Sequence, residues 1–63
     1  MNKLKELRIN KGLTQQQLSS NSGISISAIQ KLESGVNDIK RARVDIILRL
    51  SEALGVKIEE LII

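Results

Sequence analysis

The sequence contains no cysteine, no histidine, no proline and no aromatic residue. Without cysteine and histidine it has no disulfide, no thiolate nucleophile, none of the usual zinc ligand sets and no side chain that titrates near neutral pH. Its carboxylates are scattered among basic residues instead of being paired for acid and base catalysis. We therefore expect a protein that is not an enzyme and that binds no metal and no cofactor.

The missing aromatic rings also restrict the interior, which must be built from leucine, isoleucine, valine and alanine. These side chains suit closely packed short helices better than wide packed sheets. A chain of 63 residues that is 41% hydrophobic buries about 60% of the surface that its unfolded form exposes, which is enough for one core. We expect a single all-α domain that spans residues 1–63.

Long hydrophobic runs are missing as well, since the longest apolar stretches extend over only a few residues. The first residues, Met1 to Glu6, show neither the apolar segment nor the small-residue cleavage site of a secretory signal. The sequence therefore predicts no membrane segment and a soluble, cytoplasmic protein.

Basic side chains exceed acidic ones, ten against seven, which gives a net charge of +3. The whole excess lies in residues 1–35, which hold five basic and two acidic side chains. Residues 36–63 are balanced overall but include a basic cluster between Lys40 and Arg43. This distribution is compatible with a polyanionic partner, although an equally small excess occurs in proteins that bind no nucleic acid.

Glycine is the one helix-ending residue type that the chain uses, and we expect four glycines to close helices in the left-handed conformation: Gly12, Gly23, Gly35 and Gly55. Apolar spacing between them predicts five helices, over about residues 3–11, 15–22, 26–34, 44–54 and 58–62. Between the third and fourth helices, residues 36–42 should form an irregular loop that Ile39 anchors to the core.

Two of these helix starts carry the same capping signature. Thr14 and Gln17 fit a capping box, in which the threonine hydroxyl accepts from a free amide and the glutamine reaches back to the cap. Ser25 is placed to cap the helix that begins at Ile26. Apolar residues flank both caps as hydrophobic staples, Leu13 with Leu18 and Ile24 with Ile29.

Apolar residues are abundant in the C-terminal half. An inward stripe at helical spacing is formed by Val44, Ile47, Leu48, Ser51 and Leu54. Beyond this stripe remain Leu50, Ile46 and the tail Ile62–Ile63, which supply either further core packing or a face for self-association.

The two central helices form an angled pair of the helix-turn-helix type, with four apolar side chains pointing inward: Leu18, Ile24, Ile29 and Leu32. Helical spacing then leaves one outward stripe on the helix over residues 26–34, made of Ile26, Ser27, Gln30, Lys31 and Ser34.

The run LRINKGLTQQQLSSNSGISISAIQKLESG, continued by LSEALGVKIEELI, resembles the Cro/C1 (XRE) family of phage and bacterial repressors over nearly the whole chain. The most specific matching positions are Leu13 to Gln15, Leu18, Gly23–Ile24, Ile29, Leu32–Glu33, Gly35 and Ala53 to Val56. The resemblance implies a compact five-helix bundle of the lambda-repressor-like DNA-binding type. It also implies a motif over about residues 15–34, with the helix over 26–34 in the major groove.

The resemblance places the base-reading positions at Ile26, Ser27 and Lys31. Lys31 can donate to guanine, Ser27 can donate or accept, and Ile26 can pack on a thymine methyl group. Gln30 would reach a neighbouring base or a phosphate. Many relatives carry a polar residue where this chain has Ile26, so a glutamine-type contact with adenine is not available from that position.

Contacts with the DNA backbone are expected from the start of the helix over residues 15–22, from the end of the motif and from the loop after it. In the family, the glutamine that matches Gln15 touches the backbone, and the positions of Arg8 and Glu33 form an ion pair between the first and third helices. The backbone candidates are Thr14, Gln15, Gln16, Ser34, Asn37, Lys40, Arg41 and Arg43, with Lys11 a weaker one.

Other interpretations stay open. By spacing alone Ile26 can be a core residue or an ordinary exposed isoleucine, and Lys31 and the loop cations can be solvated charges. An antitoxin or regulatory subunit that acts by protein–protein interaction is the main alternative function, and a non-specific nucleic-acid binder is a third. We favour a sequence-specific repressor that binds a palindromic double-stranded operator as a homodimer, because two modules one helical turn apart gain affinity.

Overall fold

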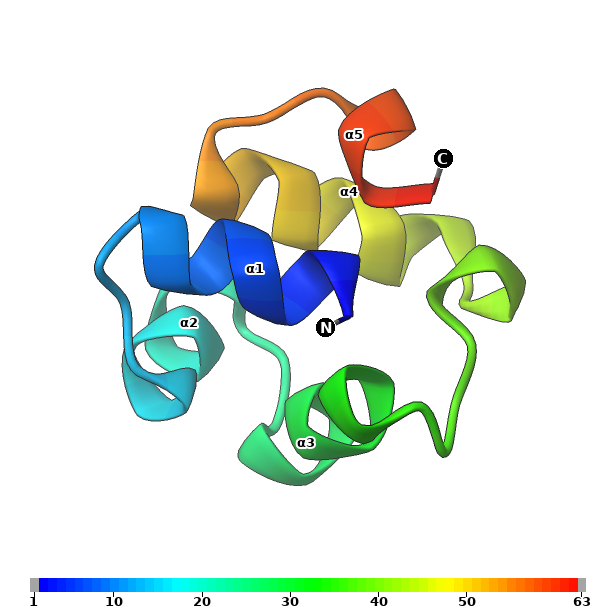
Figure 1. Ribbon diagram of the computed structural model, residues 1–63, viewed down its shortest axis with the longest axis horizontal. Helices are drawn as coiled ribbons and strands as arrows, with labels where there is room; N and C mark the ends of the chain where they lie inside the picture. Colours follow the sequence, from blue (N-terminus) through cyan, green and yellow to red (C-terminus); the bar gives the residue numbers. More distant parts are fainter. Residues whose placement is uncertain (1, 63) are drawn as a thin grey trace.

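The computed structural model describes residues 2–62, which form helices and no strand. Figure 1 shows how five α-helices fold around one another. In chain order the elements are α1 (Lys3–Asn10), α2 (Gln15–Ser22), α3 (Ile26–Ser34), the 3-10 helix η1 (Ile39–Arg41), α4 (Val44–Leu54) and α5 (Ile58–Ile62). The predicted all-α fold of five helices is confirmed, and α1 and α3 begin and end within one residue of their predicted bounds.

Side chains and glycines set the ends of α2 and α3 as the capping signature predicts. Thr14 Oγ1 accepts from the N–H of Gln17 at 3.0 Å, and the Thr14 N–H donates back to Gln17 Oε1 at 2.9 Å. Ser25 Oγ accepts from the N–H of Ala28 at 3.2 Å. Gly23 follows α2 with a φ of 73°, a conformation that a side chain disfavours, so α2 stops after about two turns.

One aliphatic core holds the helices together. The four inward positions of the α2–α3 pair are all buried, as predicted. The buried apolar residues of the described chain come from every helix: Leu4, Leu18, Ile24, Ile29, Leu32, Ile39, Ile47, Leu50, Leu54 and Leu61. The fully apolar centre of this interior is leucine and isoleucine, and smaller alanine and valine side chains pack at its edge.

The packing leaves one side of α3 at the surface. α2 lies against both α3 and α4, α5 packs on α4, and α1 crosses in front of α4 to reach α3 and α5 (Figure 1). The whole molecule measures only 23 × 23 × 22 Å. Since α1 and α2 back α3 from one side, its opposite side faces outward.

The inward stripe predicted for α4 is wrong at two positions. Val44 and Leu48 are 70% and 42% exposed, whereas Leu50 is fully buried. α4 turns its core face toward the side that carries Ile47, Leu50 and Leu54, at i, i+3 and i+7 spacing, and the 44/48 edge lies outside it. The surplus residues resolve as core, because Ile46 and Ile62 pack partly buried against the cluster. Ile63 lies outside the described residues.

The segment after α3 is more regular than expected. It contains η1, which Asp38 caps by accepting from the N–H of Lys40 at 3.0 Å. Ile39 is 9% exposed and fixes this segment to the core, as predicted. Among residues 2–62, no helix has the length and apolar content needed to cross a lipid bilayer.

Candidate nucleic-acid interface

A hydrogen-bonded turn joins α2 to α3 and fixes the angle between them. The hydroxyl of Ser19 donates to the carbonyl of Ile24 at 2.5 Å, and the hydroxyl of Ser22 donates to the carbonyl of Leu18 at 2.7 Å. Ser22 also accepts from the N–H of Ile24 at 3.2 Å. Short hydroxyl side chains thus satisfy the turn locally, which holds the first residues of α3 in one position.

The outer side of α3 presents most of the predicted stripe. Ser27, Gln30, Lys31 and Ser34 are exposed, whereas Ile26 is half-buried. Ile26 and Gln30 line an open hollow of about 650 Å³ between the end of α1, the start of α2 and the first turns of α3. The stripe is therefore a polar ridge beside a hollow rather than a row of five protruding side chains.

Ile9 also borders this hollow and is 49% exposed. The sequence reading did not single it out. A signal existed, because Ile9 lies off the α1 side that carries Leu4 and Arg8, so helical spacing leaves an isoleucine outside the core. An exposed isoleucine at the mouth of the hollow gives that edge an apolar wall.

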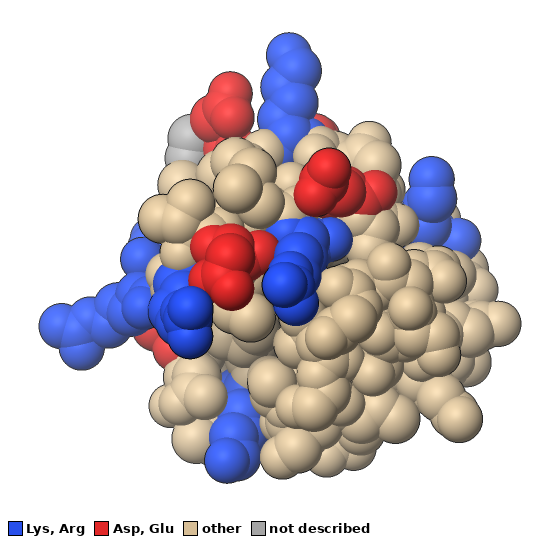
Figure 2. Space-filling model, turned by 180° about the vertical axis from the view of Figure 1, so that it is seen from behind, with Lys and Arg blue, Asp and Glu red and all other residues tan. Residues whose placement is uncertain are grey.

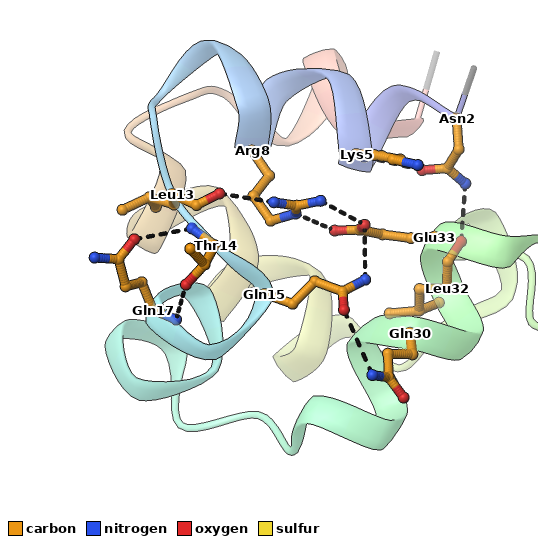
Figure 3. A network of polar contacts seen from close by, with 10 residues as sticks. All are labelled: Asn2, Lys5, Arg8, Leu13, Thr14, Gln15, Gln17, Gln30, Leu32 and Glu33. Atoms are coloured by element: carbon orange, nitrogen blue, oxygen red, sulfur yellow. Dashed lines mark hydrogen bonds and ion pairs between the residues drawn. The ribbon is translucent and has the colours of Figure 1, made fainter.

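A buried ion pair joins α1 to α3 at the floor of this region (Figure 3). Arg8 Nε donates to Glu33 Oε2 at 2.6 Å and Arg8 Nη2 donates to Glu33 Oε1 at 3.1 Å. The third donor, Nη1, reaches the carbonyl of Leu13 at 2.7 Å. The two side chains are 11% and 3% exposed. The ion pair that the resemblance implied is present, and it ties α1 and the segment before α2 to α3.

Gln15 extends this network toward the surface. Its Nε2 donates to Glu33 Oε1 at 3.1 Å, and its Oε1 accepts from Gln30 Nε2 at 3.4 Å (Figure 3). The side chain that was expected to touch the DNA backbone is therefore engaged inside the protein. The backbone amides of Gln15 and Gln16, in the first turn of α2, point away from the helix body and remain donors for an anion.

Asn2 makes a second link between α1 and α3. Its Oδ1 caps α1 by accepting from the N–H of Lys5 at 3.1 Å. Its Nδ2 donates to the carbonyl of Leu32 at 2.8 Å, in the last turn of α3 (Figure 3). The Asn2 side chain thus satisfies a free N–H at the start of α1 and a free carbonyl near the end of α3.

The remaining backbone candidates lie apart from the hollow. Asn37, Lys40, Arg41 and Arg43 are all exposed on the segment that leads from α3 to α4. Arg43 Nε lies 3.2 Å from Asp45 Oδ1, with the two side chains 85% and 47% exposed. Lys11, the weaker candidate, has its Nζ beside Gly55 at the carboxyl end of α4, where the helix dipole favours a cation.

Charge is sparse on the helix pair itself. Residues 12–30 contain no charged side chain, and within α2 and α3 only Lys31 and Glu33 are charged. Glu33 is compensated by Arg8. Figure 2 accordingly shows a broad area without blue or red atoms over the side where α2 lies. The polar groups offered here are hydroxyls, amides and backbone N–H groups.

A family model described as helix-turn-helix matches residues 4–61. The chain belongs to the Cro/C1-type helix-turn-helix family. Members of this helix-turn-helix family are DNA-binding transcription regulators rather than enzymes. No curated protein and no solved structure matches the chain. The family match fits the geometry, because the α2–turn–α3 unit is the motif and α3 is its second, outward-facing helix.

Proposed function

We propose that this chain is a sequence-specific transcription regulator, a repressor, that reads an operator with α3 in the major groove. The observation that carries the proposal is the outer side of α3. There Ser27, Gln30 and Lys31 are exposed while the inward residues of the same helix are fully buried. A helix held from behind in this way presents its polar side chains at fixed spacing to base edges.

The chemistry of each group defines what it reads. Lys31 donates to O6 or N7 of guanine, and Ser27 donates or accepts. Ile26 offers a methyl-sized apolar contact from the wall of the hollow, which suits the C5 methyl group of thymine. Together with Gln30, which lies between Ser27 and Lys31 on the same side of α3, these positions carry the sequence preference of the half-site.

Phosphate contacts position α3 before any base is read. The free amides at the start of α2, next to Thr14, suit one phosphate. Ser34 and the exposed segment after α3 suit a second, with Asn37, Lys40, Arg41 and Arg43 as its donors. Repression follows from occupancy alone, because a bound regulator excludes other proteins from the same duplex.

A homodimer on a palindromic site completes the proposal. Val44 and Leu48 are exposed one turn apart on α4, which does not carry the base-reading side chains. Two bodies 23 Å across, lying side by side, place their centres about 23 Å apart. Half-sites one helical turn apart are about 34 Å apart, so each α3 needs to lie only about 6 Å outward of its protomer's centre. We place the protein in the cytoplasm, with the DNA that it regulates.

Titration of fluorescent duplexes tests this function. We expect wild type to enrich a preferred sequence from a random duplex pool and to bind it about 1,000-fold more tightly than random DNA, with two chains per palindrome. Lys31→Ala and Ser27→Ala should each reduce that preference by about tenfold or more, because each removes a base contact worth about 1–3 kcal/mol. Lys57→Ala, in the turn before α5, removes the same charge elsewhere and should change nothing.

Two results would contradict the proposal. Binding that is equally tight on preferred and random duplexes at matched salt would indicate non-specific attraction to phosphate. Absence of binding at low salt, together with a co-purifying protein partner, would indicate the antitoxin or regulatory-subunit role instead.

A further inference from the structure

We propose that hydrogen bonds running from Glu33 through Gln15 fix Gln30 so that its amide oxygen faces the DNA. Gln30 then reads an exocyclic amino group, on adenine N6 or cytosine N4, and favours these bases over guanine and thymine, whose O6 and O4 would face its amide oxygen. This inference rests on the proposed function and adds the polarity of one base contact to it.

The chain of bonds begins at a group that only accepts. Both oxygens of Glu33 accept hydrogen bonds from Arg8, which hold the carboxylate in one orientation as an acceptor. Any further partner of Glu33 must therefore be a donor. Gln15 lies 3.1 Å from Oε1, so it turns its amide nitrogen toward Glu33 and not its oxygen.

The orientation of Gln15 also decides which atom of Gln30 donates in the hydrogen bond between the two glutamines. With Nε2 of Gln15 directed at Glu33, Oε1 of Gln15 lies on the opposite edge of the amide, 3.4 Å from Gln30. An amide oxygen is an acceptor only, so Gln30 must present its NH₂ group to it. The reverse orientation of Gln30 would bring two carbonyl oxygens together and lose the bond.

The orientation of Gln30 determines what it offers outward. Its Oε1 points away from Gln15 (Figure 3), and the residue is exposed beside the hollow. In the major groove only adenine N6 and cytosine N4 donate, whereas guanine O6 and thymine O4 accept. The second hydrogen of Nε2 can reach adenine N7, so adenine satisfies both ends of the amide.

Gln15 fixes the amide orientation of Gln30 in the free protein, before any DNA is bound. A free glutamine rotates its amide by half a turn and accepts either kind of base edge, whereas Gln15 is partly buried and anchored to a fully compensated carboxylate. The arrangement also orders Gln30 before binding, which lowers the entropy lost on contact.

The test compares base preferences selected from a random duplex pool. The operator position read by Gln30 is the one whose preference disappears in Gln30→Ala. Wild type should prefer adenine or cytosine there by about tenfold over guanine or thymine. Gln15→Met keeps an unbranched side chain but lacks the amide, so it should reduce this preference to below about threefold and leave the other positions unchanged. Asn21→Ala, which removes an exposed side-chain amide of α2 that makes none of these bonds, is the matched control.

A measurement on the DNA avoids any loss of folding in a variant. Replacing the adenine at that position by purine, which lacks the 6-amino group, should weaken wild-type binding about tenfold and leave Gln30→Ala binding unchanged. A wild-type requirement for guanine or thymine there, an unchanged profile in Gln15→Met, or indifference to the missing amino group would each overturn the inference. If no duplex is enriched at all, the proposed function itself fails.

Discussion

Two arginine–carboxylate pairs in this protein differ in environment far more than in chemistry. Arg8 and Glu33 are buried and share three further hydrogen bonds with Leu13, Gln15 and one another, whereas Arg43 and Asp45 meet in solvent. Burying two charges costs desolvation that their attraction only roughly offsets, but removing one partner leaves the other without compensation. At the surface, water solvates a charge that has lost its partner, so an exposed ion pair contributes little to the free energy of unfolding.

We therefore expect Arg8→Ala to lower the free energy of unfolding by about 3 kcal/mol. That is a large share of the roughly 3–9 kcal/mol that a chain of this length has in total. Arg43→Ala, the matched exposed arginine, should cost less than about 1 kcal/mol. Urea denaturation followed by far-ultraviolet circular dichroism measures both, and equal losses in the two variants would contradict the role given to burial.

At this same scale, the sequence predicts the Arg8–Glu33 ion pair but not the hydrogen bonds that continue from Glu33 through Gln15 to Gln30. The family resemblance pointed to Arg8 and Glu33 because their positions are fixed by the helix frame. The engagement of Gln15 depends on where two flexible side chains from separate helices meet, which no local pattern encodes. Ile26 was likewise placed on the right helix but not in its half-buried setting, since the wall that covers it comes from α1 and α2.

At the scale of single helices, local signals determine where each one begins. α2 has eight residues and no charged side chain to complement its dipole, so its first turn depends on the capping box. Sequence alone predicted these boundaries well because a cap involves residues three apart in the chain. The orientation of α4 was predicted less well, because burial of Leu50 and exposure of Val44 depend on how α2 and α5 pack against it.

Removing the hydroxyl at the start of α2 should show how much that cap contributes. Thr14→Ala loses the bond to the N–H of Gln17 and should lower the free energy of unfolding by about 1 kcal/mol. Thr14→Ser retains an equivalent oxygen and should lose only a few tenths of that. Thermal unfolding followed by circular dichroism compares them, and identical losses would show that the methyl group of Thr14, not its hydroxyl, is what stabilises the helix start.

At the scale of the whole molecule, the surface that faces DNA in our proposal carries few charged side chains. The net charge of +3 lies in residues 1–35, and Arg8, one of the five basic side chains there, contributes nothing outward because Glu33 compensates it. Only four cations lie on or after α3 before α4, namely Lys31, Lys40, Arg41 and Arg43. Neutral donors must therefore supply much of the contact with phosphates.

The salt dependence of binding measures how many of these cations contact phosphates. Each phosphate neutralised by a cation releases counterions, so binding of one protomer to a half-site should fall with a log–log slope no steeper than about −4. Arg41→Ala should make the slope shallower by about 1, while Lys57→Ala should leave it unchanged. Fluorescence anisotropy over a series of KCl concentrations gives these slopes. A value near −7 for wild type would mean that cations outside this set bind the duplex.

The bond from Asn2 to Leu32 bears on how this protein should be handled at the bench. Because that side chain joins the beginning of α1 to the last turn of α3, a purification tag or fluorophore fused ahead of it would emerge beside the helix that we place in the groove. Such a label would sterically compete with the nucleic acid and would weaken the hydrogen bond from the Asn2 amide to the Leu32 carbonyl. Labels attached behind α5, which packs on α1 and α4, avoid that interference.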